Sequence, residues 1–175
     1  KKYNLKLIFS LLMFVITFYS VCFADNKVKF SSKSNQTCVV YNGTPNHKIG
    51  KFSVQGNPNY FRPQSLKYCF LNNSVKNNKF TKLAKTIGIS LTGIPIRPGT
   101  ADWFDSLSPR KHSSDKSSGW NLEAITPSKN AFGIDQNNAH VDNIGLYHYH
   151  GMPDKLININ GKTLMGYAAD GHEIH

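Results

Sequence analysis

The segment Tyr147-His148-Tyr149-His150 constrains the fold more than any other part of this chain, because aromatic and imidazole side chains alternate along it. In a β-strand, residues i and i+2 face the same side and lie about 6.5–7 Å apart. A strand here packs Tyr147 and Tyr149 into a core and presents His148 and His150 on the opposite face. Two imidazoles at this spacing can close on one metal ion, so the segment predicts both a strand and a candidate site.

The rest of the chain is also typical of β-structure. Turn signals such as Asn42-Gly43 recur every 8–20 residues or so, and no long stretch has the period of a helix. The expected strands are Gln36–Tyr41, Leu66–Leu71, 86–91, 121–125, 146–150, 156–159 and 163–167. We therefore predict a mainly β protein, a single β-sandwich-like or compact β domain with long loops and few short helices. A short helical turn is expected at 79–86, and segments 57–64 and 98–119 are expected to be loops.

The amino-terminal segment is typical of a secretory signal peptide. Lys1 and Lys2 precede an apolar stretch of about 12 residues, and Ala24 supplies a small residue before the expected cleavage point. The apolar stretch is too short to span a bilayer comfortably. We predict a signal peptide at 1–24, a secreted or periplasmic domain at 25–175, and no transmembrane span in the mature chain.

Two cysteines, Cys38 and Cys69, remain after residues 1–24 are removed. In an oxidising compartment two cysteines usually form one disulfide, so this pair is the expected one. A loop of about 30 residues closed by such a bond contributes roughly 3–4 kcal/mol in the chain-entropy model. A metal site that used these thiols would require them to escape oxidation.

The charge of the mature chain is positive. Three of the 21 Lys and Arg residues lie in 1–24, so 18 cationic residues face 10 acidic ones and the net charge is +8. This excess points to an anionic surface or polymer as a neighbour. The lysines are scattered and form no basic stripe studded with aromatic residues, so we expect no nucleic-acid partner. The oligomeric state is left open.

Several blocks in order along the chain resemble the YHYH family, which is named for the motif at 147–150. The matching blocks are 41–47, 56–59, 93–95, 98–101, 118–124, 133–141, 145–153 and 166–171. The resemblance implies an exported domain without an assigned reaction. The residues that follow Asp170-Gly171 depart from the family pattern, which leads us to expect that the domain continues beyond His175.

A histidine cluster is the main candidate site. His140 lies just upstream of His148 and His150, and neutral imidazole is the commonest protein ligand of zinc and copper. We predict that these three histidines bind a transition metal, zinc or copper. Further ligands, or groups that orient a ligand, are sought among four other residues, namely His47, Asp135, Asp170 and His172. The alternative is a hydrogen-bonded core ladder of histidines and tyrosines without a metal.

The loop between the two histidine segments decides whether the cluster forms. Asn143-Ile144-Gly145 fits a three-residue hairpin loop in which glycine takes the positive φ. This loop places Val141 opposite Tyr147 and His140 opposite His148, so the three histidines share a face. A loop longer by one residue would flip the faces and scatter them.

Other function classes stay open at this stage. A bound metal can activate water, which would make the protein a metal-dependent hydrolase with Glu123 or Asp170 as general base. Alternatively, Trp103, Trp120 and the basic surface can serve a module that binds cell-wall or surface polymers. The oxygen ligands at 135–138 lack the spacing of a calcium loop.

Overall fold

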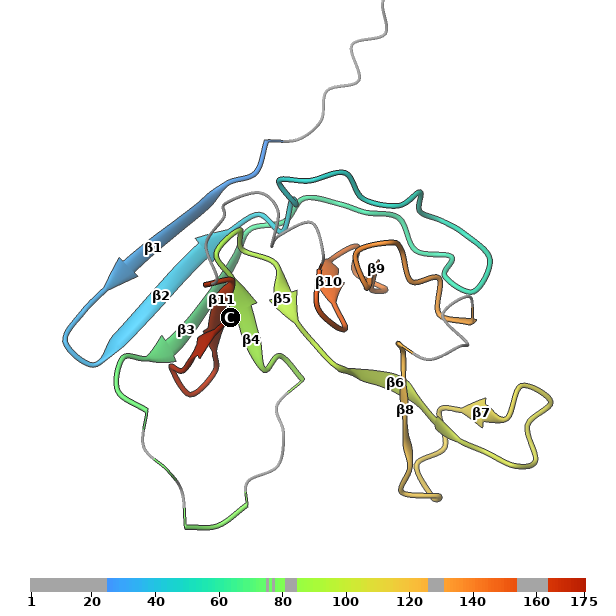
Figure 1. The fold of residues 1–175 in the computed structure, drawn as a ribbon. Coiled ribbons are helices and arrows are strands. Elements are labelled where there is room, and N and C mark those ends of the chain that lie inside the picture. Colours follow the sequence, from blue (N-terminus) through green and yellow to red (C-terminus); the bar gives the residue numbers. More distant parts are fainter. Residues whose placement is uncertain (1–24, 75, 77, 81–84, 126–130, 154–163) are drawn as a thin grey trace, which may run out of the picture.

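The computed structural model describes residues 25–74, 76, 78–80, 85–125, 131–153 and 164–175, which form three β-sheets (Figure 1). No α-helix occurs in this described part of the chain, so the mainly β class is confirmed. The predicted signal peptide and the predicted strand at 156–159 lie outside the described residues, as do residues 81–84 of the expected helical turn at 79–86.

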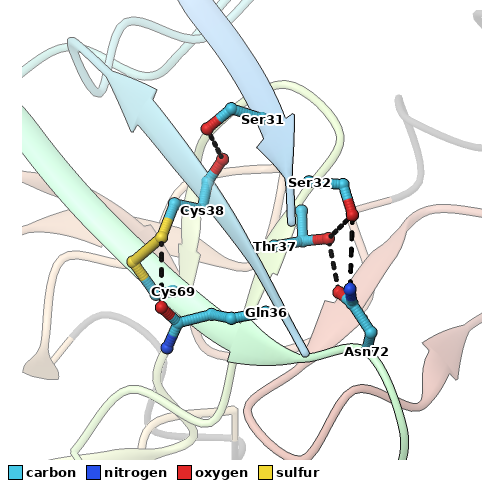
Figure 2. Close-up of a disulfide and its surroundings, with 7 residues drawn as sticks. All are labelled: Ser31, Ser32, Gln36, Thr37, Cys38, Cys69 and Asn72. Carbon is cyan, nitrogen blue, oxygen red and sulfur yellow. Dashed lines mark hydrogen bonds between the residues drawn. A yellow bond between two sulfur atoms is a disulfide. The ribbon is translucent and has the colours of Figure 1, made fainter. Parts of the chain in front are cut away.

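The first sheet is a three-stranded antiparallel sheet of β1 (Val28–Ser32), β2 (Gln36–Tyr41) and β3 (Leu66–Leu71). Both β2 and β3 have the bounds predicted from the sequence. Cys38 lies directly opposite Cys69 across these two strands, with 4.0 Å between their Cα atoms, and the two form a disulfide (Figure 2). The predicted disulfide is therefore confirmed.

The second sheet has six strands in the order β12-β11-β4-β5-β10-β9. Its strands are β4 (Gly88–Ser90), β5 (Pro95–Ile96), β9 (Ala139–Val141), β10 (Tyr147–Tyr149), β11 (Gly166–Ala168) and β12 (Glu173–Ile174). Neighbouring strands are antiparallel except β5 and β10, which are parallel with Tyr149 opposite Ile96. This parallel pair brings the chain that follows β5 alongside the carboxyl end of β10.

The third sheet corrects one prediction. Segment 98–119 was expected to be a loop because it is rich in serine and charged residues, yet it contains β6 (Gly99–Phe104) and β7 (His112–Ser113). Strand β6 pairs with β7 on one side and with β8 (Asn121–Glu123) on the other. Composition misleads here because this small sheet is largely exposed, so its strands can remain polar.

Two groups of buried side chains hold the sheets together. The first sheet packs on β4 and β11, where the rings of Phe70 and Tyr167 stack 4.8 Å apart beside the buried Val39 and Ile89. The second group lies at the other end of the central sheet and consists of Ile94, Ala139, Val141, Tyr147 and Tyr149. The tyrosines of the 147–150 motif are thus core residues, as the alternation predicts.

Candidate metal centre

The hairpin formed by β9 and β10 has the predicted register. Val141 pairs with Tyr147, and His140 pairs with His148. The amide of Gly145 donates to the carbonyl of Asp142, and Gly145 has a φ of 89°. The Asp142 carboxylate accepts hydrogen bonds from the amides of Ile144 (3.1 Å) and Leu146 (2.9 Å), which fixes the loop. The three-residue loop therefore sets the faces of both strands.

The three histidines of this hairpin converge through one nitrogen each. The Nε2 atom of His150 lies 3.1 Å from Nε2 of His148 and 3.0 Å from Nε2 of His140. One ligand nitrogen from each of the three lies within 4.8 Å of the other two. His148 and His150 are buried, and His140 is half-buried. Directly opposed residues and residues two apart on a strand share a face, which explains why the cluster forms.

The other ring nitrogen of each histidine faces a backbone carbonyl. Nδ1 of His140 lies 2.7 Å from the Phe132 carbonyl oxygen. Nδ1 of His148 lies 3.2 Å from the Leu146 oxygen, and Nδ1 of His150 lies 3.2 Å from the Pro98 oxygen. A carbonyl oxygen only accepts hydrogen bonds, so each Nδ1 carries the proton of the neutral ring. All three Nε2 atoms then present lone pairs to one another.

The separations between the nitrogens suit a metal ion. Zinc binds imidazole nitrogen at about 2.0–2.1 Å, and tetrahedral angles at that distance leave ligand nitrogens about 3.3 Å apart. The observed separations of 3.0 and 3.1 Å are slightly shorter. A metal ion would replace the contact between lone pairs with three bonds, and the backbone carbonyls already hold each ring in the required tautomer.

The protonation states favour metal binding as well. Burial lowers the pKa of His140, and burial together with the two neighbouring imidazoles holds the pKa of His148 well below its usual range. Burial lowers the pKa of His150 to about 4, and the charges of His140 and Arg97 act in the same direction. The three rings are therefore neutral at pH 7, which is the form that binds metal.

The tyrosines occupy a different environment on the opposite face of β10. The Tyr147 hydroxyl donates to Oδ2 of Asp135 at 2.8 Å and accepts from the Asn137 side-chain amide at 3.3 Å. The Tyr149 hydroxyl lies 2.6 Å from Nε2 of His47. Burial raises the pKa of both tyrosines, so both keep their protons. These contacts fix the strand that carries the histidines.

A cleft of about 670 Å³ opens beside the histidine cluster. The three histidines line it together with Arg97 and Asp142, among others. Arg97 Nη1 forms an ion pair of 2.7 Å with Asp142 Oδ2, and the two side chains are each 12% exposed. The cluster is therefore buried on the side of the strands and accessible from the cleft.

The other predicted site residues lie outside this three-histidine group. His47 and Asp135 contact the two tyrosines on the opposite face, as described above. Asp170 accepts a hydrogen bond from the amide of His172 after β11, and the side chain of Glu123 in β8 accepts one from the amide of Ile125. The cleft is not lined by Asp170, His172 or Glu123. The structure thus brings together His140, His148 and His150, and leaves the remaining candidates at separate positions.

One tryptophan lies in the third sheet and the other lies directly beside it. Trp103 is in β6 and is flanked by Lys116, whose Nζ lies 6.0 Å from the centre of the indole ring. Trp120 precedes β8 and is 74% exposed. Neither residue lines the cleft of the histidines, so polymer binding through them would be a separate property of the protein.

Sequence reasoning missed two features of the cleft. Arg97 follows β5 and reaches the histidine face because its amide donates to the Tyr149 carbonyl across the parallel strand pair. Asp102 lines the cleft and accepts from Nδ1 of the buried His112 at 2.9 Å. His112 lies in the segment expected to be a loop, where nothing in the local sequence indicates its partner. No local signal could have found either residue.

The family model of YHYH proteins matches residues 68–175, which include the hairpin and its three histidines. The chain belongs to the YHYH protein family. The resemblance drawn from its sequence blocks is therefore confirmed. No curated protein and no solved structure gives a significant match to this YHYH chain. Within the described residues, no helix has the length and hydrophobicity needed to cross a membrane.

Proposed function

We propose that this YHYH protein is exported and binds one transition-metal ion, zinc or copper, through Nε2 of His140, His148 and His150. One observation carries the proposal, namely that Nε2 of His150 lies 3.0 and 3.1 Å from Nε2 of the other two histidines while the Nδ1 atom of each ring faces a carbonyl oxygen. The disulfide between Cys38 and Cys69 is compatible with an oxidising compartment outside the cytoplasm.

A core ladder without a metal explains this arrangement less well. A ladder of histidines needs an N–H donor between each pair of rings, yet the carbonyls of Phe132, Leu146 and Pro98 take the single proton of each neutral ring. Adding a proton to one ring would supply a donor, but burial opposes a charged imidazole here. A single water molecule can donate to only two of the three nitrogens. A divalent cation satisfies all three.

A second candidate is a metal-dependent hydrolase. The observation in its favour is that the three histidines open on a cleft, which leaves room for a water ligand. Zinc sites with three protein ligands and one open position are typical of catalysis, because the metal lowers the pKa of its bound water to about 7. Asp102, whose carboxylate accepts from His112, lines this cleft, whereas Glu123 and Asp170 do not.

Elemental analysis of the oxidised, purified mature protein tests the metal proposal. We expect about one zinc or copper ion per chain after reloading and desalting. Metal at about 1,000 times its dissociation constant should raise the free energy of unfolding by about 4 kcal/mol. The matched control is His172→Ala, which removes an exposed histidine outside the cluster and should keep the metal. If wild type binds no more metal than His148→Ala, the proposal is wrong.

The hydrolase candidate needs a separate assay. Metal-loaded protein would be tested for hydrolysis of p-nitrophenyl acetate and bis-p-nitrophenyl phosphate. Activity that disappears on chelation, returns on reloading and is absent in His148→Ala would support it. Full metal content without activity toward either ester would favour a protein that binds or stores metal.

A further inference from the structure

Arg97 is the more buried of the two cationic side chains that line the cleft beside the histidines. Its Nε donates to Thr86 Oγ1 at 3.0 Å, and its Nη1 donates to Asp142 Oδ2 at 2.7 Å. No protein atom in the described part of the chain accepts from Nη2, so this end of the guanidinium keeps donors to spare. Because the side chain is only 12% exposed, its charge is weakly screened by water.

The charges around the cleft balance only when no metal is bound. Four charged side chains line it, namely Lys85, Arg97, Asp102 and Asp142. The carboxylates of Asp142 and Asp102 are already paired, the first with Arg97 and the second with His112. The four charges sum to zero, and the three imidazoles are neutral ligands. A divalent metal would therefore leave the cleft with two positive charges that no lining side chain neutralises.

We infer that the open coordination position of the metal takes a small oxoanion, such as phosphate or a carboxylate, whose remaining oxygens are bound by Arg97 with Lys85 at the rim. This inference rests on the proposed metal site. Such an anion supplies the missing negative charge and a fourth ligand at once. A guanidinium matches the geometry of carboxylate and phosphate through paired N–H donors, so Arg97 orients the anion while the metal binds it.

The carboxylates on the chain itself do not take this role. No carboxylate oxygen belongs to the group of atoms around His140, His148 and His150 in the described residues. Asp142 is turned into the hairpin loop, where its Oδ1 accepts from two backbone amides. An external anion is therefore the simplest source of a negatively charged fourth ligand.

Cobalt loading provides the test, because the visible spectrum of Co²⁺ reports the ligands around the ion. The cobalt-loaded mature protein would be titrated with inorganic phosphate and, separately, with acetate at constant ionic strength. We expect a saturable spectral change with at least one of them. Arg97→Met should weaken the anion by about 10-fold or more, and Lys85→Met by about 2-fold to 3-fold. The charge-matched control Lys29→Met, an exposed residue of β1, should change nothing.

One further control variant keeps the outcomes distinct. Arg97→Met leaves the Asp142 carboxylate without its partner, so Arg97→Met/Asp142→Asn is made in parallel and still offers Oδ1 to the loop amides. One cobalt per chain with no response to either anion at about 100 mM would overturn the anion inference and leave the metal site standing. Failure to bind cobalt, zinc or copper would instead remove the proposed metal site itself. If both Arg97 variants lose metal, the wild-type titration and Lys85→Met decide the question.

Discussion

The two faces of strand β10 differ in how their polar groups are satisfied. On the tyrosine face, each hydroxyl meets a protein partner, Asp135 for Tyr147 and His47 for Tyr149. On the histidine face, each Nδ1 faces a carbonyl oxygen, which favours the tautomer that leaves the three converging Nε2 atoms without a proton. Both faces are buried, so burial alone does not distinguish structure from function. The proposed metal would supply the partner that the three converging Nε2 atoms lack.

The largest expected effect comes from removing one member of the histidine face. His148→Ala should weaken metal binding by at least about 1,000-fold, or about 4 kcal/mol, because two imidazoles cannot hold the ion as three do. Competition with a chromophoric chelator measures the dissociation constant. Tyr60→Phe, in an exposed tyrosine, serves as the control and should leave it unchanged. Equal affinity in His148→Ala and wild type would remove the functional difference between the faces.

Acid should destabilise the metal-free protein through the same face. A histidine titrates near pH 6.5 in the unfolded chain, whereas burial lowers the pKa of His150 in the folded protein to about 4. Between these values the unfolded state binds more protons, so the free energy of unfolding falls as the pH falls from about 6.5 to 4. For His150 alone the loss approaches about 3 kcal/mol.

Urea unfolding of metal-free protein at several pH values measures this loss. His150→Gln should show a flatter pH dependence, because glutamine does not titrate, and the difference between the two proteins isolates the histidine from the carboxylates. Parallel curves for both proteins between pH 6.5 and 4 would contradict the prediction.

On the tyrosine face, Tyr147→Phe should cost about 1–3 kcal/mol of stability without loss of metal, because it removes a buried donor to a carboxylate. Chemical denaturation and metal analysis of the same sample check both parts. If Tyr147→Phe released the metal while remaining folded, the two faces would be functionally coupled.

The smallest effect is expected outside the hairpin. Trp120→Ala should change stability by less than about 0.5 kcal/mol and leave the metal content unchanged, because the residue is 74% exposed and lies beside the third sheet. Thermal unfolding and elemental analysis test this. If this variant also lost binding to an isolated cell-wall polymer, the third sheet would have a binding role separate from the histidine face.

The local sequence determined the hairpin and its two faces. The alternation at 147–150 assigns tyrosines and histidines to opposite sides, and the loop Asn143-Ile144-Gly145 fixes the register that brings His140 opposite His148. Strands β2 and β3 were predicted for the same reason, since alternation and turn residues are short-range signals. The disulfide was predicted because only two cysteines remain after residues 1–24.

Tertiary structure alone decided what surrounds the histidines. The carbonyl of Pro98, which fixes the tautomer of His150, and the guanidinium of Arg97 arrive through the parallel pairing of β5 with β10. The contact between Asp102 and His112 depends on two strands whose polar, exposed sequence resembles a loop. Periodicity reports which way a side chain faces, but it carries no information on which distant strand becomes its neighbour. The ligands could therefore be found in the sequence, whereas the groups that orient them and the charge of the cleft could not.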